Sequence, residues 1–91
     1  MTSHAGHLED RFALAQKMAT EAGALALKYF NMRDQLVIET KADPQDVVSI
    51  ADREVEELIR ARIMSAFPGD AVLGEEYGVS TGTSDYTWVI D

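Results

Sequence analysis

Apolar side chains recur every three or four residues over the first third of the chain, which is the spacing of one face of a helix. This pattern predicts a helix over about residues 8–30. Alanine and polar residues fill most of the other positions, so we interpret the face as part of the core, packed closely against another element. The face consists of Leu8, Phe12, Ala15, Met18, Ala19, Ala22, Leu25, Ala26 and Tyr29.

A second helical pattern follows a polar segment. Residues 41–46 are predicted to form a turn, in which Pro44 disfavours helical backbone at the residue before it. The periodic segment after this turn predicts a helix over about residues 49–67, and Pro68-Gly69 ends it. Its predicted inner face consists of Val55, Leu58, Ile59, Arg62, Ile63, Ala66 and Phe67.

Three short apolar segments predict strands at about residues 36–40, 71–75 and 86–91. The intervening stretch 78–85 is rich in Gly, Ser and Thr, which predicts a surface loop. The order helix, strand, helix, strand, strand indicates a mixed α and β fold, either α+β or α/β. Because an unpaired apolar strand at the end of a domain invites aggregation, we expect the 91 residues to be part of a larger domain.

Composition places the chain among soluble globular proteins, with 46% hydrophobic and 26% charged residues. No apolar run approaches the roughly 20 residues that cross a bilayer, and the first ten residues lack the features of a signal peptide. We therefore expect a cytoplasmic protein that makes no membrane contact. The absence of cysteine excludes disulfides, a thiolate nucleophile and a Cys-type zinc site.

The net charge of −8 is concentrated in the second part of the chain. Such a field repels nucleic acid and anionic membranes, and it attracts cations. A polymeric nucleic acid is therefore excluded as a partner, and a phosphate substrate would need a cation to bridge it to the protein. A solvated acidic surface without a ligand is the alternative interpretation of the charge.

Four acidic positions are candidates for chemistry: Asp46, Asp52, the pair Glu75-Glu76, and Asp91. Glu75 and Asp91 each follow a short apolar strand. If these strands are parallel neighbours, both carboxylates reach the same edge of the sheet, where a cation would offset their repulsion. Oxygen ligands without cysteine favour Mg²⁺ over zinc. Alternatively, these acidic residues only form turns.

Asp52 also has a purely structural interpretation. Ser49-Ile50-Ala51-Asp52 is close to a capping box, with Asp in place of the usual Glu or Gln, so Asp52 could serve only to start a helix. The two roles can coexist, since a carboxylate in the first turn also interacts favourably with the helix dipole. The pattern of a calcium-binding loop and that of a phosphate-binding P-loop are both absent.

Three segments resemble the inositol monophosphatase family of Mg²⁺-dependent, lithium-sensitive-type phosphatases, of which the chain looks like the N-terminal portion. Residues 41–52 (KADPQDVVSIAD) are similar to the family's K-x-x-x-x-D-x-V-T-x-x-D stretch. Residues 67–76 (FPGDAVLGEE) are similar to F-P-x-H-x-x-x-G-E-E. Residues 87–91 (TWVID) resemble the start of W-x-I-D-P-I-D-G-T. The three matches occur in the family's order and with similar spacing.

The resemblance implies roles for individual residues. Glu75 and Asp91 match metal-binding carboxylates, and Glu75 is thereby also a catalytic candidate. Asp52 matches an aspartate that orients the attacking water. Glu76 resembles a residue that supports the metal ligands.

Lys41 and Asp46 match a loop that covers the site. Ser49 stands where the family usually has Thr, and Asp70 stands where His is common.

The resemblance also implies the fold, the reaction and the assembly. The fold would be the N-terminal part of a layered αβαβα sandwich like that of fructose bisphosphatase, and the full-length protein would be a homodimer. The reaction would be Mg²⁺-dependent hydrolysis of a small phosphate monoester by water. Inositol monophosphate is the preferred substrate. Histidinol phosphate, fructose bisphosphate and 3′-phosphoadenosine nucleotides are alternatives.

Two interpretations from other classes remain open at this point. The 91 residues could form a truncated pseudoenzyme or interaction module without turnover, or an unrelated acidic binding domain that matches by chance. We expect the 91-residue chain alone to be inactive, because the P-I-D-G-T continuation and its ligands are absent from it.

Overall fold

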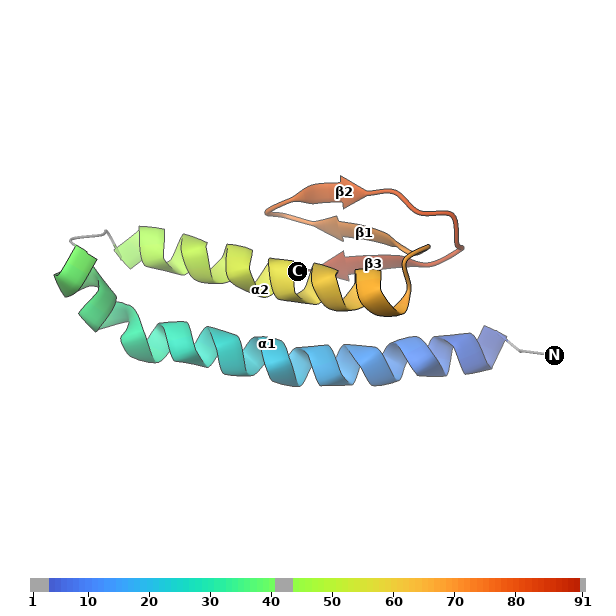
Figure 1. Ribbon diagram of the computed structural model, residues 1–91, viewed down its shortest axis with the longest axis horizontal. Coiled ribbons are helices and arrows are strands. Elements are labelled where there is room, and N and C mark those ends of the chain that lie inside the picture. The colour runs from blue at the N-terminus through green and yellow to red at the C-terminus, as the bar shows by residue number, and fades with distance from the viewer. Residues whose placement is uncertain (1–3, 41–43, 91) are drawn as a thin grey trace.

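The computed structural model describes residues 4–40 and 44–90. Two helices, α1 (His4–Thr40) and α2 (Pro44–Ala66), precede three strands, β1 (Ala71–Gly74), β2 (Gly78–Ser80) and β3 (Thr87–Ile90). The helices lie side by side and antiparallel, and the sheet is near the beginning of α1 and the end of α2 (Figure 1). This arrangement is α+β, as the sequence predicts. Within the described ranges, no helix is long and apolar enough to cross a membrane.

The three strands form one mixed sheet in the order β2-β1-β3. β1 pairs with β2 antiparallel and with β3 parallel. In the parallel pair, Gly74 at the end of β1 lies opposite Ile90 at the end of β3. The two strands are therefore parallel neighbours, which is the condition for the candidate metal site, and both end at the same edge of the sheet. Glu75 follows Gly74, and Asp91, which lies outside the described residues, follows Ile90 in the sequence.

The core joins both helices to the sheet. Met18 of α1, Ile63 of α2 and Val72 of β1 are buried together, and four partly buried residues pack around them: Leu14, Ile59, Trp88 and Ile90. The middle of the predicted first helix face is thus buried, as expected. Its beginning is not, since Leu8 and Phe12 are 59% and 64% exposed.

The strand predicted at residues 36–40 is wrong, because α1 continues as a helix to Thr40. The β-branched residues there suggested a strand, but a strand also needs a neighbour to accept and donate its backbone hydrogen bonds. Among the described residues, the only sheet consists of β1, β2 and β3. Continuing the helix lets the N–H groups of these residues bond to carbonyls one turn earlier in the same helix, without a neighbouring strand.

The start of the second helix also differs from the prediction. α2 begins at Pro44 rather than near Ser49, which accords with the preference for proline in the first helical turn, where its missing N–H costs nothing. Ser49 and Asp52 therefore lie inside the helix, and the capping-box interpretation is wrong. In addition, the stretch predicted as a loop contains β2, a strand too short to produce an alternating pattern.

Gly82 lies where the loop before β3 crosses the segment that leads into β1. The Gly69 carbonyl accepts hydrogen bonds from the Thr83 and Ser84 amides, at 2.8 and 2.9 Å. A Cβ on Gly82 would overlap the Gly69 carbonyl oxygen and lie 2.6 Å from the carbonyl carbon of Asp70. All of these are backbone atoms, so relief requires the loop to move.

We expect Gly82→Ala to lower the free energy of unfolding by about 1–3 kcal/mol through this overlap. The matched control is Gly23→Ala in α1, where a Cβ meets no atom within 4 Å. That change should raise stability by up to about 1 kcal/mol, since alanine favours helix over glycine. Urea unfolding of both variants measures the difference. Equal changes in the free energy of unfolding for the two substitutions would contradict the close packing of Gly82 against the backbone of Gly69 and Asp70.

Candidate functional site

A cavity of about 250 Å³ lies where the carboxyl ends of β1 and β3 meet the helices. It is lined by Ala26, Asp52, Val55, Glu56, Glu75, Glu76 and Ile90. Four of these residues are acidic, and none of the described residues that line the cavity is basic. Asp52, Glu75 and Glu76, three residues predicted for the site, are thus brought to one place from separate parts of the sequence.

Secondary structure explains this convergence. Asp52 and Glu56 are four residues apart on α2, so they share one face of the helix. Glu75 and Glu76 begin the turn after β1, beside the end of β3. Glu75 also borders a second cavity of about 250 Å³, together with Leu73, Gly74, Val89 and Ile90. It therefore lies at the edge of the sheet, accessible from two sides.

Glu56 is the buried member of this group, with only 3% of its surface exposed. Its Oε1 accepts a hydrogen bond from the Glu76 amide at 3.0 Å. Its Oε2 accepts one from the Tyr77 amide and one from Arg60 Nε, both at 2.9 Å. Burial raises the pKa of the Glu56 carboxyl, but the hydrogen bonds from the Glu76 amide, Arg60 and the Tyr77 amide outweigh burial, and the pKa is lowered.

Arg60 extends the same contact to β2. Besides its bond to Glu56, it donates from Nη2 to the carbonyl of Gly78, a residue with the positive φ of 72° that glycine accommodates. Glu56 and Arg60 together hold the turn from Glu75 to Gly78 against α2. Glu56 is not among the residues that the sequence indicated for the site. The available signal was its position on the buried stripe of α2, three residues before Ile59 and seven before Ile63.

Asp46 and Ser49, two further residues predicted for the site, do not line this cavity. Asp46 and Ser49 are exposed on the first turns of α2. Lys41 and Asp91 lie outside the described residues. Within the described residues, no group of three or more His, Cys, Asp or Glu is placed to hold a metal ion. The donors that do line the cavity are carboxylate oxygens, which suit a hard cation such as Mg²⁺.

Asp70 is the centre of a second polar cluster, at the opposite edge of the sheet. It is 6% exposed and accepts hydrogen bonds from Arg11 Nε (2.7 Å) and Nη2 (2.8 Å), Ser84 Oγ (2.6 Å) and Trp88 Nε1 (2.8 Å). The hydrogen bonds from Arg11, which have the largest effect, and those from Ser84 and Trp88 outweigh burial and together lower the pKa of Asp70 to about 2. This buried carboxylate links α1 to β3. The sequence indicated it only as a departure from the family pattern.

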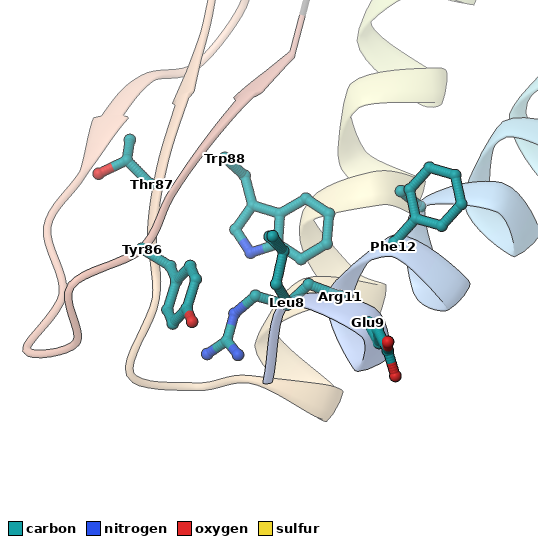
Figure 2. Close-up of a pocket in the computed structure, with 8 residues that line it drawn as sticks. Leu8, Glu9, Arg11, Phe12, Tyr86, Thr87 and Trp88 are labelled. Carbon is teal, nitrogen blue, oxygen red and sulfur yellow. The ribbon is translucent and has the colours of Figure 1, made fainter. Parts of the chain in front are cut away.

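A cavity of about 460 Å³ adjoins this cluster between α1 and β3 (Figure 2). Figure 2 shows the Arg11 side chain beside Tyr86, and the guanidinium carbon lies 3.7 Å from the centre of that ring. Leu8, Phe12 and Trp88 make most of the lining apolar. Such a surface does not suit a phosphate group, so the acidic cavity is the better candidate for chemistry.

Comparison with known proteins gives one family. The model of the inositol monophosphatase family matches residues 7–91. The chain is 45% identical over 82 residues to the histidinol-phosphatase of Streptomyces coelicolor, covering 90% of this chain and 30% of that protein. It is 40% identical over 78 residues to the histidinol-phosphatase of Chlorobaculum parvum, covering 86% of this chain and 29% of that protein. It is 43% identical over 63 residues to the inositol-1-monophosphatase of Bacillus subtilis, covering 69% of this chain and 23% of that protein. The chain thus spans about 30% of the length of the first curated relatives it matches.

Proposed function

This chain belongs to the inositol monophosphatase family, and from this premise we propose that the intact protein hydrolyses a small phosphate monoester with the help of Mg²⁺. The observation that carries the proposal is the cavity at the carboxyl edge of β1 and β3. Asp52, Glu75 and Glu76 line it, and no basic residue is among its described lining. Carboxylates gathered in this way repel both one another and a phosphate unless a cation lies between them.

The ion would be held by Glu75 together with Asp91, the residue that follows β3. When bound, Mg²⁺ supplies the positive charge that offsets the phosphoryl oxygens and makes water a better nucleophile at neutral pH. Asp52 approaches the same cavity from α2 and is proposed to accept a hydrogen bond from the attacking water. Its role is to orient that water and to stabilise the positive charge that develops on the water as its oxygen bonds to phosphorus.

The proposed reaction is a direct displacement. The water oxygen forms a bond to phosphorus and loses a proton, the bond from phosphorus to the ester oxygen breaks, and the departing oxygen takes up a proton, so that no net proton is released. The products are an alcohol and inorganic phosphate, and no covalent bond to the protein is formed.

For the substrate, we propose inositol monophosphate first. Histidinol phosphate is the second candidate, because two of the relatives described above are named histidinol-phosphatases. Assembly as a homodimer is implied by the family resemblance, and a cytoplasmic location is expected from the sequence; both remain predictions.

A comparative assay of the intact protein tests this function. Phosphate release is measured with inositol monophosphate, histidinol phosphate, fructose bisphosphate and 3′-phosphoadenosine 5′-phosphate, each with Mg²⁺ and with excess EDTA. We expect one substrate to exceed the others by at least about tenfold in kcat/KM, which corresponds to about 1.4 kcal/mol of discrimination. We expect EDTA to remove the activity. Absence of release from all four substrates in the presence of Mg²⁺ would contradict the proposal.

A further inference from the structure

We propose that Glu56 is a positioning residue for the cation site: its carboxylate holds the backbone after β1 so that Glu75 borders the same cavity as Asp52. The inference rests on the proposed function, because it concerns the residues to which that function assigns the cation. It starts from a buried acidic residue that forms part of the cavity wall and that the reaction itself does not use.

The hydrogen bonds define what Glu56 holds. Its two oxygens accept from the amides of Glu76 and Tyr77, the two residues that follow Glu75. Because these amides belong to the turn itself, their attachment to α2 fixes the path of the backbone immediately after Glu75. Without this attachment, the turn between the two short strands would be free to move, and the Glu75 carboxylate would be oriented less firmly toward the cation.

Packing at Gly74 strengthens this attachment. A Cβ at this position would lie 2.5 Å from both Cδ and Oε1 of Glu56, so the carboxylate rests directly against the glycine backbone. Glu56 thereby contacts the chain on both sides of Glu75, at residue 74 and at residues 76 and 77. The residue assigned to the cation lies between two points that are tied to α2.

The same contacts argue against Glu56 as a ligand. Its Oε2 already accepts hydrogen bonds from the Tyr77 amide and from Arg60, and the guanidinium places a positive charge at that oxygen. Its Oε1 accepts from the Glu76 amide. A cation bound through Glu56 would lie close to the positive charge of Arg60, whereas Glu75 and Asp52 are exposed. Glu56 therefore acts on the cation through the position of Glu75.

The test is Glu56→Gln in the intact protein, with Mn²⁺ as a paramagnetic substitute for Mg²⁺. Whichever way the amide is oriented, its NH₂ group faces an N–H donor, so at least one hydrogen bond to the turn is lost. We expect the dissociation constant for Mn²⁺, measured by electron paramagnetic resonance, to rise about tenfold. Hydrogen exchange of the Glu76 and Tyr77 amides should accelerate, and kcat at saturating Mg²⁺ should fall less than the affinity does.

Two further variants complete the test. Glu54→Gln makes the same charge change at an exposed position on α2 and should leave the affinity for Mn²⁺ unchanged. Arg60→Lys keeps the positive charge but loses the planar donors that join Glu56 to the Gly78 carbonyl. The dissociation constant for Mn²⁺ should rise about threefold. The effect is smaller than that of Glu56→Gln because the hydrogen bonds from the Glu76 and Tyr77 amides to Glu56 remain. It provides a milder variant if Glu56→Gln does not fold.

The outcomes separate this inference from the function on which it rests. If the parent protein binds Mn²⁺ and releases phosphate, but both Glu56→Gln and Arg60→Lys retain its affinity, the positioning role is wrong and the function stands. A lower unfolding midpoint with unchanged Mn²⁺ affinity also overturns positioning, since it reveals only a structural role. If Mn²⁺ binding depends on Glu56 while no substrate is hydrolysed, the positioning role holds and the proposed reaction is wrong.

Discussion

Replacing Glu75 by Gln is expected to lower Mg²⁺-dependent phosphate release by the intact protein at least about a hundredfold, which corresponds to about 2.7 kcal/mol of lost transition-state stabilisation. Gln has almost the same shape as Glu but lacks the negative charge that favours a divalent cation. Glu75 is exposed at the edge of the sheet, so the fold should be maintained. The measurement is kcat/KM on the best substrate at saturating Mg²⁺, accompanied by Mn²⁺ binding.

Asp85→Asn is the matched control for this variant. Asp85 is an exposed carboxylate in the loop before β3, and it does not line the acidic cavity. The Asp85→Asn variant should retain the parent's activity and affinity for Mn²⁺, although it changes the net charge by the same amount as Glu75→Gln. Asp91→Asn should reproduce the loss caused by Glu75→Gln. Parental turnover in both Glu75→Gln and Asp91→Asn would show that the metal assignment is wrong.

The placement of Glu75 was predictable because a simple rule governs it. Two short apolar segments are each followed by an acidic residue. If the two strands pair in parallel, both end at the same edge of the sheet, and the register of Gly74 opposite Ile90 confirms that they do. Asp52 was predictable only through the resemblance, since its local pattern also suggested a helix start. The observed start of α2 at Pro44 removes that alternative. The metal-binding and water-orienting roles stay predictions.

The missed features depend on contacts between distant residues. The segment 36–40 has the composition of a strand, but the pairing that decides between strand and helix involves other parts of the chain. β2 has three residues and is held by the distant side chain of Arg60. Asp70 follows a Pro-Gly turn and resembles any polar turn residue. Its main partner, Arg11, is 59 residues away in the sequence, so no local pattern indicates the pair.

Asp70→Asn is expected to destabilise the intact protein by about 3 kcal/mol or more at pH 7, the usual result of removing one partner from a buried ion pair. Each oxygen of Asp70 accepts two hydrogen bonds: Oδ1 from Arg11 and Ser84, and Oδ2 from Arg11 and Trp88. An amide NH₂ in either place would face two donors. Glu21→Gln is the control, because it breaks the more exposed ion pair with Arg62 and should have a much smaller effect.

The loss in Asp70→Asn should depend on pH in a direction that the lowered pKa determines. The pKa of Asp70 falls from its ordinary value of 3.8 to about 2 in the folded protein. The stability it contributes is therefore fully present above about pH 4 to 5 and is lost as the pH falls toward 2. Urea unfolding at pH 7, 5 and 3 should give a difference between parent and variant that is constant at the two higher values and smaller at pH 3. If the difference in stability between parent and variant grew on acidification, Asp70 would not be the charged partner of Arg11 in the folded protein. If parent and variant had equal urea midpoints at pH 7, the Asp70 cluster would not stabilise the junction of α1 with β3.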